Sequence, residues 1–222
     1  MKPIIFNTEM VKAILDGRKT VTRRILKLPK SIWTIDKDCE IFQTCLRDGT
    51  GLINAEEITE YFSPIKKADI LWVRETWRPL NVNYPNSAID YAADWNAKYF
   101  ENSKNDNCGK WHPSIHMPRD AARIFLKVTD VRVERLQDIT VEDCMAEGIS
   151  CNNEIRNPNP ETHESIKNWN KSYAQFLFKD LWDSTIKKTD IDKHGWNANP
   201  WVWVIEFEKI DKELISNANK NA

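Results

Sequence analysis

Apolar residues recur along the chain at two spacings, and these spacings predict which segments form strands and which form helices. Short apolar or alternating runs predict strands, whereas apolar residues three or four positions apart predict helices. Strands and helices do not alternate regularly, so we expect an α+β fold around a small, mostly antiparallel sheet or barrel. The predicted strands lie at residues 2–6, 19–26, 68–77, 122–136 and 199–210. The predicted helices lie at residues 8–16, 140–147 and 168–184, with Thr8 and Thr140 as N-terminal caps and Gly17 and Gly148 as terminators.

Charge is balanced over the 222 residues. Lys and Arg number 32, Asp and Glu number 33, and the formal net charge is −1. A protein that coats nucleic acid or a membrane by overall attraction needs a strong excess of basic residues. Any contact with nucleic acid must therefore come from a local basic patch.

Cysteine usage and hydropathy suggest an intracellular protein. The five cysteines are an odd number at irregular spacing, and none form a C-x-x-C pair. This is not the pattern of a disulfide framework, so a reducing cytoplasm is the expected setting. No apolar run approaches the roughly 18 residues that a membrane span needs. We therefore expect a soluble cytoplasmic protein without a membrane partner.

The segment "LDGRKTVTRR", residues 15–24, carries the first candidate chemistry. A threonine hydroxyl becomes a nucleophile when a neighbouring base takes its proton, and a lysine of lowered pKa is such a base. Lys19 and Thr22 are the candidate pair. A solvated basic strand edge explains the same residues equally well. Residues three apart point to opposite faces of a regular strand, so the pair can converge only where the chain after Gly17 still turns or bulges.

Two carboxylates and two tryptophans are further candidates. Glu147 falls in the last turn of a predicted helix, where the negative end of the helix dipole disfavours its charge unless a cation compensates. Glu75 follows a strand, and an ion pair with Arg74 or another basic residue is its simplest explanation. Trp77 and Trp111 are suited to stack on a planar ligand.

Metal and cofactor sites are not predicted. Cys108, His112 and His116 have the spacing C-x-x-x-H-x-x-x-H, but Pro113 prevents the regular helix that would put both imidazoles on one face. With only six glycines, the chain also lacks a glycine-rich loop for phosphate. We expect neither a metal nor a cofactor.

The order of motifs resembles that of an ASCH domain, a small β-barrel module related to PUA RNA-binding domains. The motifs are "ILDGRKTVTRR", "ADILWVRETW", "FLKVTDVRVERLQDIT", "AEGI" and "WVIEFE". The long insertions resemble those of ASCH-domain proteins encoded by bacteriophages and prophages. The resemblance implies one elaborated domain over residues 1–210, followed by a charged tail at 211–222. Its core segments would be 1–28, 65–78, 119–149 and 199–210, and its insertions 29–64, 79–118 and 150–198.

The same core is similar to that of the N4-acetylcytidine amidohydrolases, in which a lysine, a threonine and a glutamate form the catalytic set. Carried over by motif, these fall on Lys19, Thr22 and Glu147. The resemblance implies an amidohydrolase that removes an acyl group from an N-acylated nucleobase or nucleoside. This chain is much longer than those enzymes, so its insertions could reshape the pocket. The residues expected to contact substrate are Arg18, Arg23, Arg24, Glu75, Trp77 and Trp111.

A second reading treats the chain as an RNA- or nucleotide-binding module without catalysis. Arg18, Lys19, Arg23 and Arg24 would then hold phosphate while tryptophans stack on bases. Some ASCH domains resemble ribonucleases, so RNA cleavage is a further alternative. The near-zero net charge favours the enzyme acting on a small molecule.

Overall fold

The computed structural model describes residues 1–27, 32–34, 44–46, 52–80, 88–95, 109–149 and 163–212. The chain divides into two compact units, each made of separate segments. Unit 1 comprises Met1–Gly17, Ala68–Val128 and Phe207–Ala222, and unit 2 comprises Arg18–Lys67 and Thr129–Glu206.

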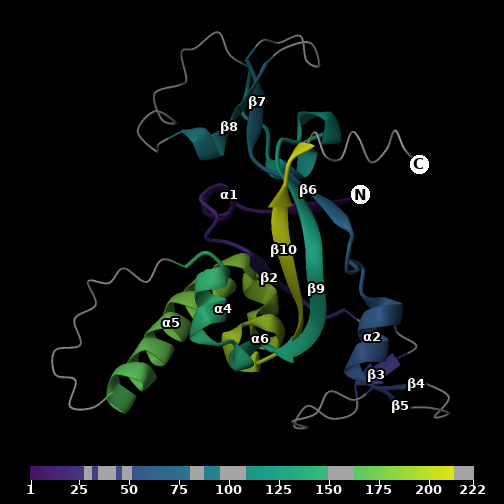
Figure 1. Cartoon of the computed structure of the whole chain (residues 1–222), viewed down its shortest axis with the longest axis vertical. Coiled ribbons are helices and arrows are strands. Elements are labelled where there is room, and N and C mark those ends of the chain that lie inside the picture. The colour runs from purple at the N-terminus through teal and green to yellow at the C-terminus, as the bar shows by residue number, and fades with distance from the viewer. Residues whose placement is uncertain are drawn as a thin grey trace. The chain divides into compact units, whose positions relative to one another are not determined.

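The largest sheet has five strands in the order β1-β6-β9-β10-β2 (Figure 1). β1 pairs with β6 in parallel, whereas β6 pairs with β9 and β10 pairs with β2 in antiparallel fashion. The predicted α+β class with a mostly antiparallel sheet is therefore confirmed. β1 and β2 are the end strands of this sheet, so among the described strands it is open and does not close into the expected barrel. The strands are β1 (Lys2–Ile5), β2 (Val21–Ile25), β6 (Ile70–Arg74), β9 (Phe125–Arg135) and β10 (Trp201–Ile210).

Unit 1 contains the first helix, α1 (Thr8–Leu15). Its N-terminal cap is Asn7, whose side chain accepts a hydrogen bond from the backbone N–H of Met10, so the prediction of Thr8 as the cap was wrong. β7 (Trp77–Pro79) pairs with β8 (Ile89–Tyr91) in a separate two-stranded sheet. One apolar core of this unit is formed by Trp77, Met117, Ala121, Ala122 and Phe125.

Unit 2 places three helices against the paired strands β2 and β10. The helices are α4 (Val141–Ala146), α5 (His163–Thr185) and α6 (Ile191–His194), and α4 packs against α5 (Figure 1). Thr140 caps α4 as predicted, because its side chain accepts from the backbone N–H of Asp143. α5 begins five residues earlier than the predicted start at residue 168. The core of this unit is formed by Val21, Leu136, Ile139, Cys144, Ala174, Phe178, Trp182, Val202 and Val204.

The sequence placed residues 29–64 in an insertion to which no strand or helix was assigned, and part of it forms regular elements. Three short strands, β3 (Ile32–Thr34), β4 (Thr44–Leu46) and β5 (Leu52–Ile53), form a separate antiparallel sheet. The helix α2 (Ala55–Phe62) follows them. It begins in a capping box, in which Asn54 and Glu57 bond each other's backbone N–H.

Within the described part of the chain, the helices are too short or too polar to cross a lipid bilayer.

Candidate active site

Lys19 lies between a tight turn and a strand. Gly17 has a φ of +75°, which a residue with a side chain adopts only with strain, and β2 begins at Val21. Lys19 itself forms an isolated antiparallel bridge with Glu147 rather than a strand pair. The chain therefore does not run as one regular strand from Lys19 to Thr22, so strand alternation alone does not fix the relative directions of these two side chains.

The Lys19 ammonium group is enclosed by oxygen atoms. Its side chain is 0% exposed, and Nζ donates hydrogen bonds to the backbone oxygen of Val21 at 2.9 Å and of Glu147 at 2.9 Å. A third bond runs from Nζ to Oε2 of Glu147 at 2.5 Å. An ammonium group has three protons to donate, so each has an acceptor in this arrangement.

Burial and charge act on Lys19 in opposite directions. Desolvation lowers the pKa of Lys19 below its ordinary value of 10.5, and the carboxylate of Glu147 opposes this shift. The positive charges of Arg24 and Arg23 lower the pKa further. The net result is a lowered pKa of Lys19, so the neutral amine is easier to reach at physiological pH than in an ordinary lysine.

Glu147 is held in place at the end of α4. Glu147 is the C-terminal cap residue of that helix, and Gly148 follows it with a φ of 93°. The backbone N–H of Thr20 donates to the carbonyl oxygen of Ala146 at 2.8 Å. This backbone bond lies next to the bridge between Lys19 and Glu147. The Glu147 side chain is 4% exposed. The end of α4 is thus fastened to the chain just before β2.

Arg23 is a second buried cation beside Glu147. A solvated basic strand edge would expose this residue, but its side chain is 0% exposed. Its guanidinium group donates to Glu147 Oε1 at 3.4 Å, to Asp143 at 2.8 Å and to Glu134 at 3.3 Å. It also lies over the ring of Phe178, 6.0 Å from the centroid. The roles of Asp143 and Glu134 were not foreseen, since no motif marks them.

Thr22 lies within β2, opposite Ile205 of β10. The residue is 3% exposed, and among the described residues its hydroxyl group has no hydrogen-bond partner. In the described part of the chain, no hydrogen bond joins this hydroxyl group to Lys19 or Glu147. The structure therefore brings Lys19, Arg23 and Glu147 into contact and leaves the Thr22 hydroxyl available for another group.

Arg24 and Arg18 are the exposed arginines of this segment. Arg18 donates to the carbonyl oxygen of Gly148 at 2.8 Å. The Arg24 side chain as a whole is exposed, yet surrounding protein desolvates its guanidinium group enough to lower the pKa of Arg24, an effect that Glu147 opposes. Its charge also acts on Lys19. Arg24 therefore interacts electrostatically with both members of the buried pair.

Glu75 belongs to unit 1, where an ion pair accounts for it. Its side chain is 1% exposed, and its two carboxylate oxygens accept from Arg123 at 2.9 and 3.0 Å. Arg123 also contacts Asp94 at 2.7 Å and lies 3.9 Å from the ring centre of Tyr91. Arg74, the partner suggested by the sequence, instead donates to backbone oxygens. Burial raises the pKa of Glu75, and Arg123 opposes that rise.

The two candidate tryptophans are also in unit 1, and both pack against protein groups. Trp77 is 5% exposed and stacks on His112, with ring centroids 5.0 Å apart. The Arg78 guanidinium contacts both Trp111 and Trp95, whose ring centroids lie 4.6 and 4.7 Å from it, and the two rings meet each other edge to face. The Trp77 and Trp111 rings thus contact protein groups of unit 1.

The possible metal pattern gains no support from the described residues. Among them, no three His, Cys, Asp or Glu side chains are grouped as metal ligands would be. His116 lies in a short 3₁₀ segment at Ser114–His116. Cys108 lies outside the described residues.

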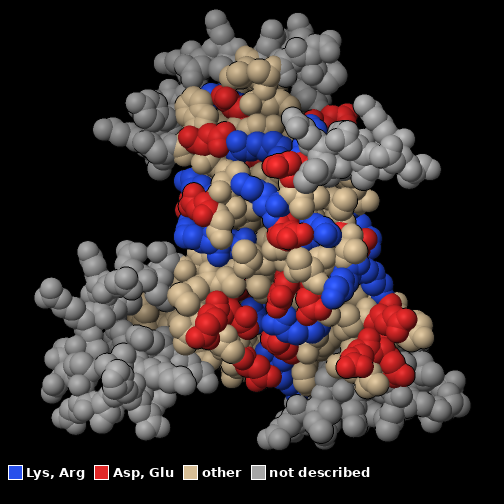
Figure 2. All heavy atoms as spheres, viewed as in Figure 1, with Lys and Arg blue, Asp and Glu red and all other residues tan. Residues whose placement is uncertain are grey.

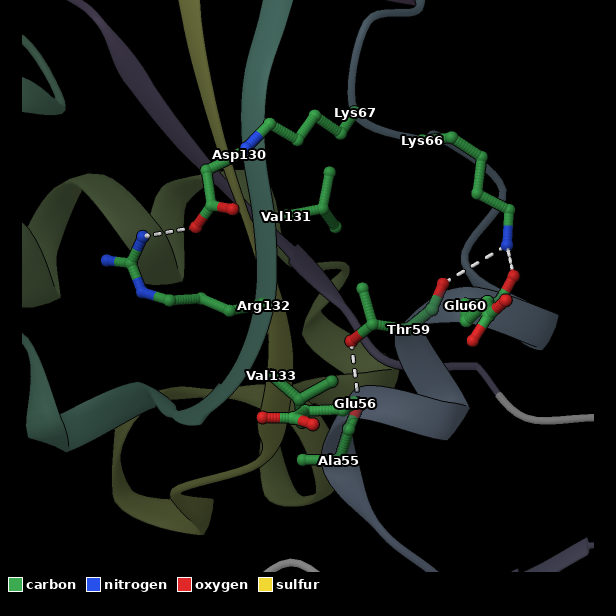
Figure 3. A pocket seen from close by; sticks show the side chains of 10 residues that line it. All are labelled: Ala55, Glu56, Thr59, Glu60, Lys66, Lys67, Asp130, Val131, Arg132 and Val133. Carbon is green, nitrogen blue, oxygen red and sulfur yellow. Dashed lines mark hydrogen bonds and ion pairs between the residues drawn. The ribbon is translucent and has the colours of Figure 1, made fainter.

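Unit 2 also contains a pocket of about 430 Å³ that involves none of the candidate site residues. It lies between α2 and β9, with Ala55 and Thr59 on one side and Val131 and Val133 on the other (Figure 3). Charged side chains surround its mouth. Figure 2 shows that basic and acidic side chains are interspersed over the visible face, so no large patch of one sign dominates that view.

Comparisons of the chain with protein-family models, with curated proteins and with solved structures gave no match.

Proposed function

We propose that unit 2 carries an amidohydrolase site for N-acylated nucleobases or nucleosides of the N4-acylcytidine type, on a scaffold related to the ASCH and PUA-like modules. The observation that carries the proposal is the buried ion pair between Lys19 and Glu147, with Thr22 three residues along the same segment. A threonine nucleophile needs a base, and a buried lysine of lowered pKa on the same segment is suited to that role. The acyl-cytidine specificity follows from the resemblance in sequence.

The proposed reaction has two steps, acylation of Thr22 and hydrolysis of the acyl ester. In the first, Thr22 Oγ attacks the acyl carbonyl carbon while the neutral amine of Lys19 takes the hydroxyl proton. The C–N bond then breaks, and the departing amino group receives that proton, which leaves an acyl ester on Thr22. In the second step, water attacks the ester and gives a proton to Lys19, the acid is released and Thr22 regains its hydroxyl proton. This requires Thr22 Oγ to reach Lys19 Nζ directly or through one water molecule.

Two neighbouring groups support this chemistry. Glu147 fixes the orientation of the lysine through its carboxylate and its backbone oxygen. Arg24 is exposed and interacts electrostatically with the buried pair, so its positive charge is suited to stabilise the oxyanion that forms during attack.

The test is hydrolysis of N4-acetylcytidine and of longer-chain analogues by the wild type and by Thr22→Val. This substitution keeps the shape of the side chain and removes the hydroxyl group. We expect loss of turnover by at least about 100-fold, since a nucleophile has no substitute in the mechanism. Thr22→Ser should retain measurable turnover.

Thr20→Val is the matched control. Thr20 is an exposed threonine on the same segment, and its backbone contact with Ala146 does not involve its side chain. It should turn over substrate like the wild type. Equal turnover by Thr22→Val and the wild type would exclude Thr22 as the nucleophile.

The exposure of Arg18 and Arg24 favours a second candidate function, the binding of RNA or a nucleotide without catalysis. Binding through phosphate contacts weakens steeply with salt. The competing result is therefore RNA binding that falls with salt concentration, is reduced in Arg24→Gln, and is accompanied by no product.

A further inference from the structure

The carboxylate of Glu147 is shared by two buried cations. Its Oε2 accepts from Lys19 at 2.5 Å, and its Oε1 accepts from Arg23 at 3.4 Å. Neither cation has an exposed side chain. The two differ chemically, because an arginine keeps its proton at any physiological pH whereas a buried lysine can lose its proton.

This difference matters when Lys19 acts as a base. A neutral Lys19 no longer compensates the charge of Glu147, and a buried carboxylate without a counter-charge is costly. If Lys19 were the sole partner of Glu147, its deprotonation would be coupled to that cost and the lysine would hold its proton tightly. A permanent cation on the other carboxylate oxygen removes the coupling.

We propose that Arg23 is a positioning residue that serves as the permanent counter-charge of Glu147 and so allows Lys19 to release its proton while Glu147 stays ionised. The inference rests on the proposed function of Lys19 as the base. The buried guanidinium group of Arg23 contacts Glu147, Asp143 and Glu134. It acts through Glu147.

The surroundings of Arg23 fix its guanidinium group in this role. Asp143, one turn before Glu147 on α4, accepts from the same nitrogen as Glu134 of β9 does, and the ring of Phe178 lies beside the group. A planar guanidinium can donate to several carboxylates at once, which a lysine at this position could not do with the same geometry.

The charges that face Lys19 are consistent with this role. Arg23 and Arg24 both lower the pKa of Lys19, while Glu147 raises it. Glu147, Arg23 and Arg24 are the charged groups that act on Lys19 itself, and Arg23 in turn contacts Asp143 of α4 and Glu134 of β9.

The decisive experiment measures the titration of Lys19 directly, by NMR of protein labelled with ¹³C at the lysine ε carbon. The Lys19→Met variant assigns the signal. We expect Arg23→Gln to move the Lys19 midpoint to higher pH. The acidic limb of the pH–rate profile should move with it, so that each unit of rise costs about tenfold in rate at a pH on that limb.

Arg132→Gln is the matched control. Arg132 shares Glu134 with Arg23 but has no contact with Glu147. The Lys19 midpoint should remain at its wild-type value in this variant. An unchanged or lowered midpoint in folded Arg23→Gln, or an equal rise in Arg132→Gln, would overturn the proposal.

Asp143→Asn gives a prediction of opposite sign and does not depend on the folding of Arg23→Gln. Asp143 competes with Glu147 for Arg23, so its neutralisation leaves more of the guanidinium charge to Glu147. The Lys19 midpoint should then fall. A rise would contradict the role given to Arg23. Because the NMR titration needs no substrate, it tests Arg23 even if the wild type hydrolyses no acylated nucleoside, a result that would reject the proposed function alone.

Discussion

Lys19 donates hydrogen bonds to two different oxygens of a single residue, the backbone carbonyl and the carboxylate of Glu147. The side chain of Glu147 therefore cannot rotate away without breaking one bond, and the backbone at the end of α4 cannot move without breaking the other. The pair fixes the position of the helix end relative to the start of β2. This gives the candidate base a defined orientation before any substrate arrives.

Removal of one member of this pair should destabilise the fold strongly. We expect Glu147→Gln to lower the free energy of unfolding by about 3–5 kcal/mol, because it leaves two buried cations facing a neutral amide. Urea denaturation measures the loss. In the double variant Lys19→Met/Glu147→Gln, the Lys19→Met substitution removes one of those cations. The double variant should therefore lose less unfolding free energy than the sum of the losses in the two single variants. Additive losses would show that the two side chains do not depend on each other.

Gly148 should resist replacement by residues with side chains. Its φ of 93° is strained for any other residue, so Gly148→Ala should lower the free energy of unfolding by about 1–2 kcal/mol. Gly17→Ala, at a φ of 75° with open space around the added carbon, should show a comparable backbone cost. Thermal and urea unfolding check both values. A neutral effect of Gly148→Ala would mean that the turn after Glu147 adapts freely.

The stability of the protein should depend on pH through Glu75. Burial raises the pKa of this carboxyl above its ordinary value of 4.5, against the opposing effect of Arg123. The folded state then binds the proton more tightly than the unfolded state, so the free energy of unfolding falls as the pH rises from the ordinary value through the raised one. Glu75→Gln should remove this contribution. Unfolding in urea at a series of pH values tests it, and parallel curves for wild type and variant would contradict it.

Arg78 should be sensitive to replacement by lysine. Its guanidinium group contacts the rings of both Trp95 and Trp111 and donates to Asp90 at 3.1 Å. Arg78→Lys keeps the charge but loses the flat stacking group, for which we expect a loss of about 1–2 kcal/mol in urea unfolding. The exposed Arg119 provides a control, since Arg119→Lys should change stability by less than about 0.5 kcal/mol. Similar small effects of both substitutions would show that the stacking contributes little.

Apolar spacing and capping signals predicted several elements at their observed positions. The strand β10 and the helix α4, with its cap Thr140, appear where the apolar spacing placed them. The cap of α1 was misplaced by one residue because Asn7 and Thr8 are both good caps and adjacent, and the side chain that bonds Met10 decides between them. The helix α2 was missed because the whole insertion was read as polar, although the spacing of Asn54 and Glu57 is a capping-box signal.

The sequence predicted which residues form the candidate site better than it predicted which of them are in contact. The sequence pattern and the resemblance singled out Lys19, Thr22 and Glu147. Nothing in the local pattern showed that Arg23 is buried, since a basic residue on a strand is normally exposed. Its burial depends on carboxylates from β9 and α4, which lie far along the chain. Contacts of this kind arise from tertiary packing and leave no periodic signal.

The Lys19–Glu147 contact joins positions that are 128 residues apart. At a synthesis rate of about 5–20 residues per second, roughly 6 to 26 seconds separate the making of these two residues on a ribosome. Throughout that interval Lys19 and Arg23 have been made but Glu147 has not. The middle segment of unit 1, Ala68–Val128, is produced in the same interval. The Lys19–Glu147 pair can therefore form only late during translation, and an activity that depends on this pair, as we propose, would appear only after that point.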